Sequence, residues 1–243
     1  MLKRIKNIIR NVSINSIEPR KAYDIWADAY DSQDDNLVFI MESEILDTLL
    51  DEIDLTEKVI LDYGCGTGRN WERILSYNVE KIIGCDISPN MLEKIKNKYQ
   101  GYETYFIKKH SPLPLEDEAI DIIFSTLVIA QINNINNLFS EWNRLLRPGG
   151  LILLTDLHPE ILSAGGKRTF EKDGRTYNIK NYIHSIEKIK MICAGFNLEV
   201  KDLKERHITA ESKAYYEKKN ALHIYNKFYG LPLVYGILIR KKQ

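Results

Sequence analysis

Short apolar segments alternate with helical segments through the middle of the chain, and this alternation limits the fold more than any other feature. A strand, a helix and a second strand in succession form a unit whose strands run parallel and whose helices cover the sheet. The sequence therefore predicts an α/β protein with a Rossmann-like, doubly wound, mostly parallel sheet. The strands of this part are expected at 58–63, 81–85, 102–107, 120–125 and 151–155.

Two later strands, at 198–203 and 233–240, complete a predicted seven-stranded sheet. An amphipathic segment at 211–228 separates them, which favours an antiparallel pair, and with it an antiparallel edge strand, at one side of the sheet. Helices at 18–30 and 36–53 are expected before the first strand.

We interpret residues 1–243 as a single domain, because no Pro/Gly/Ser-rich linker and no internal repeat divides the chain. Within this domain, residues 1–55 are expected to form an N-terminal helical cap, and residues 204–232 an inserted, lid-like segment. Sheets of this kind bind ligands beyond the carboxyl ends of their strands, and the insertion is expected to lie there.

The composition excludes several classes of protein. The 243 residues include 34 Lys+Arg and 34 Asp+Glu, so the net charge is zero and no basic stripe favours nucleic acid. The longest apolar runs are far shorter than a membrane span. Three cysteines without a CxxC pair or a Cys/His cluster argue against a disulfide framework and a structural zinc site. We therefore expect a cytoplasmic protein with no metal, no nucleic-acid partner and no stable membrane insertion.

The first ten residues, MLKRIKNIIR, alternate basic and apolar side chains. They lack the uninterrupted apolar stretch and the small-residue cleavage site of a signal peptide. Their spacing suits a short amphipathic helix that docks on a membrane surface or a partner. The alternative, which we favour, is a terminus that frays or packs on its own domain.

The segment VILDYGCGTG, residues 59–68, is the strongest local motif. Glycines at a turn from strand to helix let the backbone approach a ligand closely, and the helix start then offers N–H groups to its anionic end. The dinucleotide pattern GxGxxG fails, because Arg69 is the sixth residue counted from Gly64, and no GK[ST] follows as in a P-loop. An acidic residue, Asp62, stands just before the turn.

A second acidic residue, Asp86, ends the next predicted strand, in the segment KIIGCDISPNML. A carboxylate at this place can accept both hydroxyl groups of a ribose in a nucleotide-cofactor site. It can also cap the helix that is expected to begin at Pro89. The glycine turn and the acidic strand end together are more specific than either one alone.

Several motifs in this order resemble the class I S-adenosylmethionine-dependent methyltransferases, especially the small-molecule enzymes related to ubiquinone/menaquinone methyltransferases. VILDYGCGTG looks like the first motif of that family, and GCDISPNML like its second. HSPLPLEDEAIDIIFSTLVIAQI is similar to the third and fourth motifs, and EWNRLLRPGGLILLTD to the fifth. The resemblance covers roughly residues 20–157 and is looser toward the end of the chain.

This resemblance implies S-adenosyl-L-methionine as the cofactor and S-adenosyl-L-homocysteine as its product. The glycine turn would pass beside the methionine portion, with Asp62 near its amino end, while Asp86 would hold the ribose hydroxyls. Tyr23 and Tyr30 would close over the cofactor, or else make aromatic core contacts between helices. The implied cofactor-binding residues are Tyr23, Tyr30, Asp62, Gly64, Cys65, Gly66, Gly68, Asp86, Ile87, Met91, His110, Ser111 and Leu127.

The adenine contacts depend on a part of the chain that departs from the family pattern. Ile87 and Met91 would flank the adenine, and the backbone of Leu127 would line the methionine portion. Related enzymes often carry an acidic residue before the LP element, where this chain has KKH at 108–110, so the contact to the adenine edge is assigned to His110 or Ser111.

Methyl transfer from a sulfonium is an in-line displacement, which requires a positioned acceptor and exclusion of water. An acceptor that must lose a proton also needs a base. His158, which follows the fifth strand and precedes Pro159, is the catalytic candidate, although a histidine here can equally be a loop residue bonded to backbone. Ala130-Gln131 replaces a His pair of many relatives, so no catalytic histidine is expected there.

A polar excursion, residues 162–182, follows and contains Lys167, Arg168 and Arg175. These side chains could recognise an anionic group of a substrate. The alternative is a solvated hairpin whose turn is the Asp-Gly pair at 173–174, and we favour the hairpin.

The sequence as a whole indicates an enzyme that transfers a methyl group from S-adenosylmethionine to a small-molecule acceptor. Two alternatives stay open, a nicotinamide-dependent Rossmann oxidoreductase and a noncatalytic adenosylmethionine-binding module. The first is disfavoured by Arg69 and by the antiparallel strands near the end of the chain. The acceptor, the methylated atom and the oligomeric state do not follow from the sequence.

Overall fold

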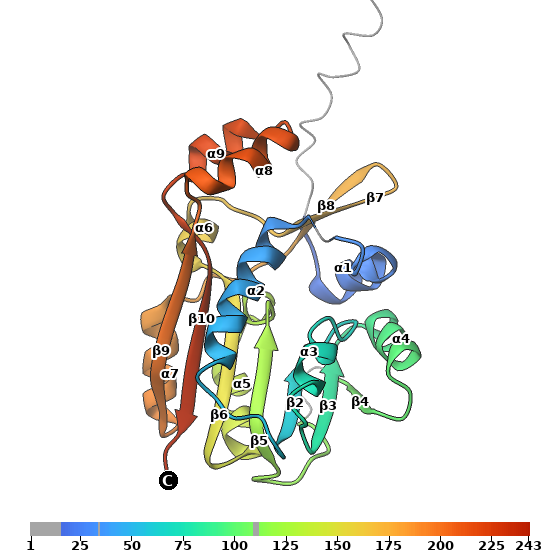
Figure 1. The fold of residues 1–243 in the computed structure, drawn as a ribbon, viewed down its shortest axis with the longest axis vertical. Coiled ribbons are helices and arrows are strands. Elements are labelled where there is room, and N and C mark those ends of the chain that lie inside the picture. Colours follow the sequence, from blue (N-terminus) through green and yellow to red (C-terminus); the bar gives the residue numbers. More distant parts are fainter. Residues whose placement is uncertain (1–15, 34, 109–111) are drawn as a thin grey trace, which may run out of the picture.

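The computed structural model describes residues 16–33, 35–108 and 112–243, and the basic segment at 1–10 lies outside this part. Seven strands form one sheet in the order β4-β3-β2-β5-β6-β10-β9 (Figure 1). The strands are β2 Val59–Tyr63, β3 Lys81–Asp86, β4 Glu103–Phe106, β5 Ile120–Thr126, β6 Leu146–Leu157, β9 Leu198–His207 and β10 Pro232–Lys241. The predicted doubly wound α/β fold is confirmed.

Five strands of the sheet, β4 to β6 in spatial order, run parallel. The chain enters at the central strand β2, adds β3 and β4 on one side, and then adds β5 and β6 on the other. The connections therefore diverge at the carboxyl end of β2, the place where such sheets bind ligands. The glycine turn follows β2 directly, so the topology places it at this point.

The two late strands form the antiparallel pair that the sequence predicts. β10 pairs antiparallel with both β6 and β9, so the antiparallel strand lies one position inside the edge and β9 is outermost. The connection between these two strands, residues 208–231, contains two short helices rather than one long one. Asn220 adopts a left-handed conformation, with φ of 53°, where the amphipathic segment breaks.

Helices cover both faces of the sheet, and several begin at the residues that the sequence indicates. The Ser88 side chain accepts a hydrogen bond from the Met91 N–H at 3.2 Å, with Pro89 as the first helical residue. The helices are α1 Pro19–Trp26, α2 Leu37–Leu50, α3 Trp71–Leu75, α4 Pro89–Lys98, α5 Ile135–Leu145, α6 Pro159–Ser163, α7 Ile186–Gly195, α8 Lys213–Lys218 and α9 Leu222–Phe228, with single 3-10 turns at Ala27–Ala29, Ile129–Gln131 and Ala210–Ser212. None of the helices in the described ranges is long and apolar enough to cross a membrane.

One boundary differs from the expectation. The segment at 147–150 belongs to β6, which begins at Leu146 directly after α5, so this strand starts five residues before the expected Leu151. Leu146 pairs with Ile120, and a register shift between Ile120 and Ile122 takes up the Pro-Gly-Gly sequence. Glycine and proline here accommodate a bulge, so the strand extends back through them to the end of α5.

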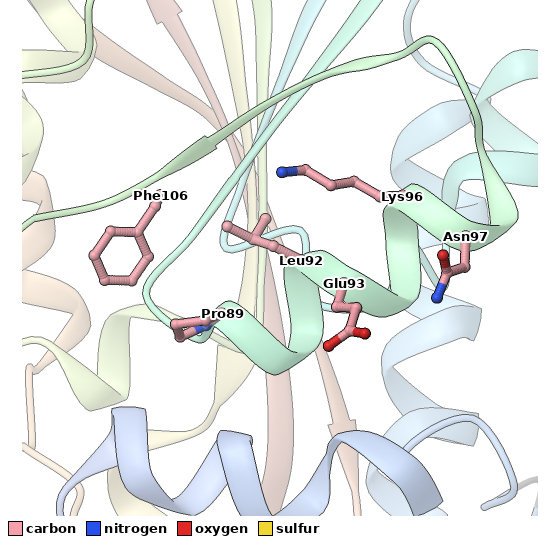
Figure 2. A pocket seen from close by; sticks show the side chains of 6 residues that line it. All are labelled: Pro89, Leu92, Glu93, Lys96, Asn97 and Phe106. Carbon is pink, nitrogen blue, oxygen red and sulfur yellow. The ribbon is translucent and has the colours of Figure 1, made fainter.

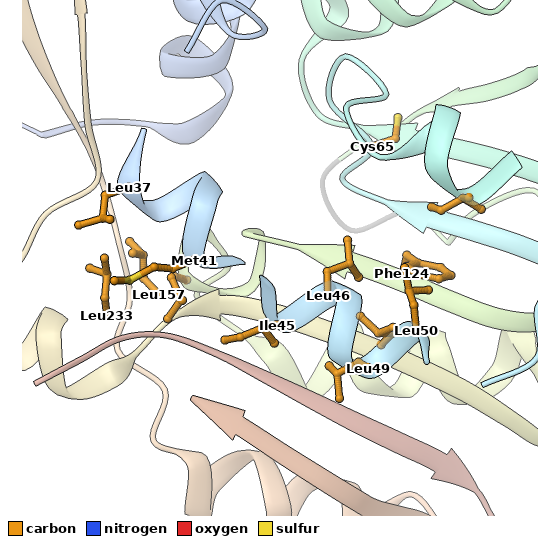
Figure 3. Packing of buried hydrophobic residues seen from close by; sticks show 14 of the residues in the cluster. Leu37, Met41, Ile45, Leu46, Leu49, Leu50, Cys65, Phe124, Leu157 and Leu233 are labelled. Atoms are coloured by element: carbon orange, nitrogen blue, oxygen red, sulfur yellow. The ribbon is translucent and has the colours of Figure 1, made fainter. Parts of the chain in front are cut away.

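At one point the central helix α2 packs directly on the backbone of the sheet, because the sheet residue there is a glycine. Ile45, Leu46 and Leu49 are fully buried, and this helix faces β5, β6 and β10 (Figure 3). A side-chain carbon at Gly236 of β10 would lie 2.3 Å from Cγ2 of Ile45, so only glycine fits there. The opposite face of the sheet is covered by α5 and α7, with the buried Trp142 at its centre.

A small second sheet lies beside the carboxyl ends of the parallel strands (Figure 1). It has the order β1-β8-β7, with β1 Ser16–Ile17, β7 Thr169–Lys172 and β8 Arg175–Ile179. Asp173 and Gly174 both have positive φ, 52° and 68°, as a two-residue hairpin turn requires. The predicted hairpin is therefore confirmed.

Candidate functional site

The glycine turn is fixed to the end of the neighbouring strand β3. The N–H groups of Gly64 and Cys65 both donate to the Cys85 carbonyl, at 2.7 and 3.0 Å. Gly64, Gly66 and Gly68 have positive φ values of 81°, 54° and 75°. Because L side chains rarely adopt this region, the backbone path itself requires glycine.

The three glycines differ in what surrounds them. A side-chain carbon at Gly64 would lie 2.3 Å from Cγ2 of Val128, and one at Gly68 would lie 2.9 Å from Ile95. Among the described residues, the one atom within 4 Å of a side-chain carbon at Gly66 is the Met91 sulfur, at 4.0 Å. Gly64 and Gly68 are thus required by packing, whereas Gly66 borders open space that a ligand could fill.

Asp86, at the end of β3, joins this turn directly. Its side chain is 9% exposed, Oδ2 accepts the Gly66 N–H at 2.9 Å, and Oδ1 accepts the Ser88 N–H at 2.8 Å. Burial raises the pKa of this carboxyl to about 6. Each oxygen takes one of these bonds and keeps a lone pair, so the group can accept further hydrogen bonds from a ligand.

Asp62, the last buried residue of β2, is the second carboxylate of the site. Its Oδ2 accepts the indole N–H of Trp71 at 2.8 Å. Burial raises the pKa of Asp62 to about 7, the indole bond opposes this rise, and the negative charge of Asp86 adds to it. Two buried carboxylates whose pKa values are raised by burial favour a cationic ligand group.

Other expected residues lie around these two carboxylates. Ile87 is half-buried and Met91 is buried at the start of α4. Leu127, just after β5, has a φ of 60° and donates its N–H to the Thr155 carbonyl at 2.8 Å. A left-handed leucine is a strained conformation of the kind found at functional sites. His110 and Ser111 lie outside the described residues.

Cys65 contributes its backbone to the turn. Its side chain is buried next to Gly84, at a distance that leaves no room for a Cβ on that glycine. Burial raises the pKa of the thiol well above its usual value, so it stays protonated.

The N-terminal helix is tied to the glycine turn and to α4 by two carboxylates that sequence analysis missed. Asp24 accepts a hydrogen bond from the Ser88 hydroxyl at 2.6 Å, and Asp31 accepts one from the Thr67 hydroxyl at 2.5 Å. Each aspartate directly follows one of the two expected tyrosines in KAYDIWADAYD, which was the available signal.

Tyr23 and Tyr30 both pack against Trp26, with ring centres 6.0 and 4.9 Å from it and 6.4 Å from each other. Both belong to an aromatic cluster with Phe39 of α2 and Phe170 of β7. Burial raises the pKa of Tyr23, so its phenol is neutral. The tyrosines thus make the core contacts expected in one interpretation, and their closure over the cofactor stays a prediction.

His158 is 3% exposed and uses both ring nitrogens. Nδ1 accepts the Glu160 N–H at 3.2 Å, so the histidine caps α6, and Nε2 lies 3.0 Å from Oε1 of Glu205. The bond to Nδ1 assigns the proton to Nε2, which donates to the carboxylate. In this arrangement neither nitrogen has a free lone pair.

A surface hollow of about 370 Å³ lies between α4 and β4 (Figure 2). It is lined by Pro89, Leu92, Glu93, Lys96, Asn97 and Phe106. None of these residues belongs to the expected cofactor set, and the two site carboxylates do not line it. We therefore assign no role to this hollow.

Residues 61–154 match a family model described as a methyltransferase domain. A malonyl-[acyl-carrier protein] O-methyltransferase of Methylovorus sp. (strain MP688) is 27% identical over 210 residues, which cover 81% of this chain and 69% of that protein. A demethylmenaquinone methyltransferase of Tropheryma whipplei (strain Twist) is 26% identical over 148 residues, which cover 60% of this chain and 62% of that protein. Three other relatives named malonyl-[acyl-carrier protein] O-methyltransferase are matched over 44 to 56% of their length.

The solved structure of an S-adenosylmethionine-dependent methyltransferase from Listeria monocytogenes aligns with a TM-score of 0.63 at 18% identity, covering 83% of this chain and 98% of that one. This likeness establishes the fold. Together with the family model and the curated relatives, it identifies the chain as a class I S-adenosylmethionine-dependent methyltransferase. Its cofactor is S-adenosyl-L-methionine.

The residues of the site fit that cofactor. Gly66 borders space that the described residues leave open. Asp86 retains lone pairs for two hydroxyl groups, and Asp62 is a buried carboxylate that an ammonium group would stabilise. These three features lie at the diverging connections beyond β2, where the fold binds nucleotides.

Proposed function

We propose that this protein transfers a methyl group from S-adenosyl-L-methionine to a small-molecule acceptor by in-line displacement. One observation carries the proposal. The N–H of Gly66 lies 2.9 Å from Oδ2 of Asp86, so the glycine turn and the acidic strand end form one site although they are 20 residues apart. If the glycines served only packing, or if Asp86 served only to cap α4, that bond would not be needed.

The individual cofactor-binding residues are proposals that rest on the family resemblance, and the bond between Gly66 and Asp86 supports the glycine turn and the acidic strand end among them. Asp86 would hold the ribose hydroxyls, Asp62 the amino end, and the backbone of Gly64 to Gly68, with Cys65 between them, the methionine portion. Ile87, Met91 and either His110 or Ser111 would meet the adenine, and Leu127 would line the methionine side. Tyr23 and Tyr30 would close the site from the N-terminal cap.

Bound S-adenosylmethionine supplies an electrophilic methyl group on a sulfonium. The chain has to position the acceptor in line with that methyl group and to exclude water, and positioning alone can lower the barrier by about 7–11 kcal/mol. The N-terminal segment is suited to exclude water, because Asp24 and Asp31 hold it against Ser88 and Thr67 at the mouth of the site.

We keep His158 as the candidate base for an acceptor that must lose a proton. Glu205 would stabilise the imidazolium, since its carboxylate already faces Nε2. The proton would then be taken at Nδ1, which requires that the Glu160 N–H first give up its bond to that nitrogen. An acceptor that is already an anion needs no such step.

The domain boundaries, cellular location and partners are part of the proposal. Residues 1–55 would act as a cap and residues 204–232 as a lid within one domain, although β9 continues to His207 and so includes the first four residues of the lid. Three free, buried cysteines support a cytoplasmic location.

The relatives carry names with different acceptors, a malonyl group on a carrier protein and demethylmenaquinone, so they favour no single acceptor.

Turnover separates an enzyme from a noncatalytic adenosylmethionine-binding module. The protein is incubated with methyl-labelled S-adenosylmethionine and a panel of small acids, phenols, amines and thiols, with Asp86→Ala as the matched control. We expect a labelled product and S-adenosylhomocysteine with at least one acceptor class, and neither with the variant. Binding of the cofactor without product from any class would contradict the enzymatic proposal.

A further inference from the structure

Among the described residues, a buried guanidinium without an acidic partner lies beside the N-terminal cap. Arg168, the residue before β7, is 4% exposed. Its Nε and Nη2 atoms have no hydrogen-bond partner within residues 16–33, 35–108 and 112–243. Buried polar groups are normally hydrogen-bonded, and an unpaired buried charge is strongly unfavourable. Packing alone therefore does not account for this side chain.

Aromatic groups surround this guanidinium. Its central carbon lies 5.4 Å from the ring centre of Trp26 and 5.5 Å from that of Phe39. The phenols of Tyr23 and Tyr30 interact with its charge, and Tyr23 also forms a side-chain hydrogen bond with the guanidinium. Neutral rings stabilise a cation partially but provide no counter-charge.

Asp156, the acid with the largest effect on this charge among the described residues, is occupied by backbone groups. Its Oδ2 accepts the Ala130 N–H at 2.8 Å and its Oδ1 accepts the Leu157 N–H at 2.7 Å. No ion pair forms between Asp156 and Arg168 in the part of the chain that the structure describes. The guanidinium edge thus stays available in spite of its burial.

Arg69 provides an internal comparison, because it lies against the same aromatic ring. Its guanidinium carbon is 4.7 Å from the ring centre of Phe39, and its Nη2 pairs with the fully buried Glu42 at 2.5 Å. The fold therefore supplies a carboxylate to one of the two arginines on this ring. It leaves the other, Arg168, for a carboxylate from elsewhere.

The position of Arg168 suits an acceptor rather than a cofactor. It lies between the tyrosines of the cap, Arg69 just after the glycine turn, and Asp156 near the carboxyl end of β6. These elements enclose the carboxyl ends of the parallel strands, where a second ligand would meet the first. Lys167, its neighbour, is exposed and takes no part.

We propose that Arg168 binds a carboxylate of the methyl acceptor through the edge formed by Nε and Nη2. This inference rests on the function proposed above and adds the substrate class to it. Two donors on one edge of a guanidinium match the two oxygens of a carboxylate in parallel hydrogen bonds. Because the single positive charge of Arg168 lies next to Asp156, it suits a monoanion better than a phosphate dianion. Trp26 and Phe39 provide an apolar surface for the rest of the acceptor. Because the edge is buried, α1 and the β7–β8 hairpin must part for the acceptor to enter.

The test uses the full chain saturated with S-adenosylhomocysteine. Acetate, butyrate and benzoate are titrated at constant ionic strength while the unfolding temperature is followed, with acetamide, butyramide and benzamide as neutral counterparts and inorganic phosphate as a competing anion. The variants are Arg168→Gln, Arg168→Lys and, as a matched control, Lys167→Gln, which removes the same charge from the exposed neighbour.

We expect at least one carboxylate, and not its amide, to raise the unfolding temperature of the wild-type complex. Arg168→Gln should weaken that binding at least tenfold, Arg168→Lys should weaken it less, and Lys167→Gln should not change it. Equal binding in wild type and Arg168→Gln, no response to any of the three carboxylates, or tighter binding of phosphate would each overturn the proposal. If Arg168→Gln does not fold, the lysine variant and the comparison of acids with amides decide. Failure of S-adenosylhomocysteine to bind the wild type would instead contradict the proposed function itself.

Discussion

Replacing Gly64 or Gly66 by alanine adds the same methyl group two residues apart, yet the structure predicts different main effects. At Gly64 the new carbon would stand 2.3 Å from Cγ2 of Val128, a short and stiff side chain. At Gly66 it would stand in open space beside the Met91 sulfur. The first change should act on folding and the second on cofactor binding.

The magnitudes follow from two terms. A left-handed conformation costs about 1–2 kcal/mol for a residue with a side chain, and both positions have positive φ. Overpacking adds about 1–3 kcal/mol, and only Gly64 incurs it. Gly64→Ala should therefore lower the free energy of unfolding by about 2–5 kcal/mol and Gly66→Ala by about 1–2 kcal/mol.

Gly101→Ala is the matched control. Gly101 has a φ of 86°, and no atom of the described residues lies within 4 Å of the added carbon, so this variant isolates the backbone term outside the glycine turn. Urea unfolding gives the three free energies, and calorimetric titration with S-adenosylhomocysteine gives the affinities. We expect Gly66→Ala to bind at least tenfold more weakly than Gly101→Ala, which corresponds to about 1.4 kcal/mol or more.

Two results would refute this reasoning. Unchanged affinity of Gly66→Ala would mean that the open space beside Met91 is not the cofactor site. A Gly64→Ala variant no less stable than Gly101→Ala would mean that Val128 moves aside freely, and that the turn does not depend on the contact between them.

Three further predictions concern the site residues. Asp86→Ala should weaken binding of S-adenosylhomocysteine by about 1.5–3 kcal/mol, as for lost hydrogen bonds to a charged group, and a folded variant of normal affinity in calorimetry would contradict the ribose role. Because the pKa values of Asp62 and Asp86 are raised to about 7 and about 6, the ligand-free protein should lose stability as pH rises from about 4 to 7. Its affinity for S-adenosylhomocysteine should increase over the same window, because the carboxylates ionise. An affinity that does not change between pH 5.5 and 8 would oppose this prediction. His158→Asn can still cap α6 whereas His158→Ala cannot, at a cost of about 1 kcal/mol, so normal turnover by the asparagine variant on an identified acceptor would exclude His158 as the base.

Periodicity and capping residues were sufficient to predict the architecture. Buried strands such as 59–63 stand out by their apolar runs, and Ser88-Pro89 marks the start of α4, because these signals act within a few residues. The start of β6 could not be predicted, because the Pro-Gly-Gly segment joins this strand through its pairing with β5, which is a tertiary contact. A long-range pairing of this kind leaves no local trace.

The candidate site divides in the same way. The glycine turn and Asp86 could be found because both follow strands whose carboxyl ends must meet. Whether a given side chain is buried or paired depends on distant neighbours: Arg168 and Lys167 are adjacent in the sequence, yet one is buried against Trp26 and the other is exposed. The bonds from Asp24 to Ser88 and from Asp31 to Thr67 likewise join residues 64 and 36 positions apart.

The most direct test of the cofactor assignment is a thermal-shift titration of the protein with S-adenosylhomocysteine, S-adenosylmethionine, NADH and NADPH in parallel. A ligand at 100 times its dissociation constant stabilises the fold by about 2.7 kcal/mol, which for a chain of this length raises the unfolding temperature by about 5–11 °C. The structure predicts that shift with the two adenosyl compounds and none with the nicotinamides. A shift with the nicotinamides alone would contradict the assignment and favour the oxidoreductase.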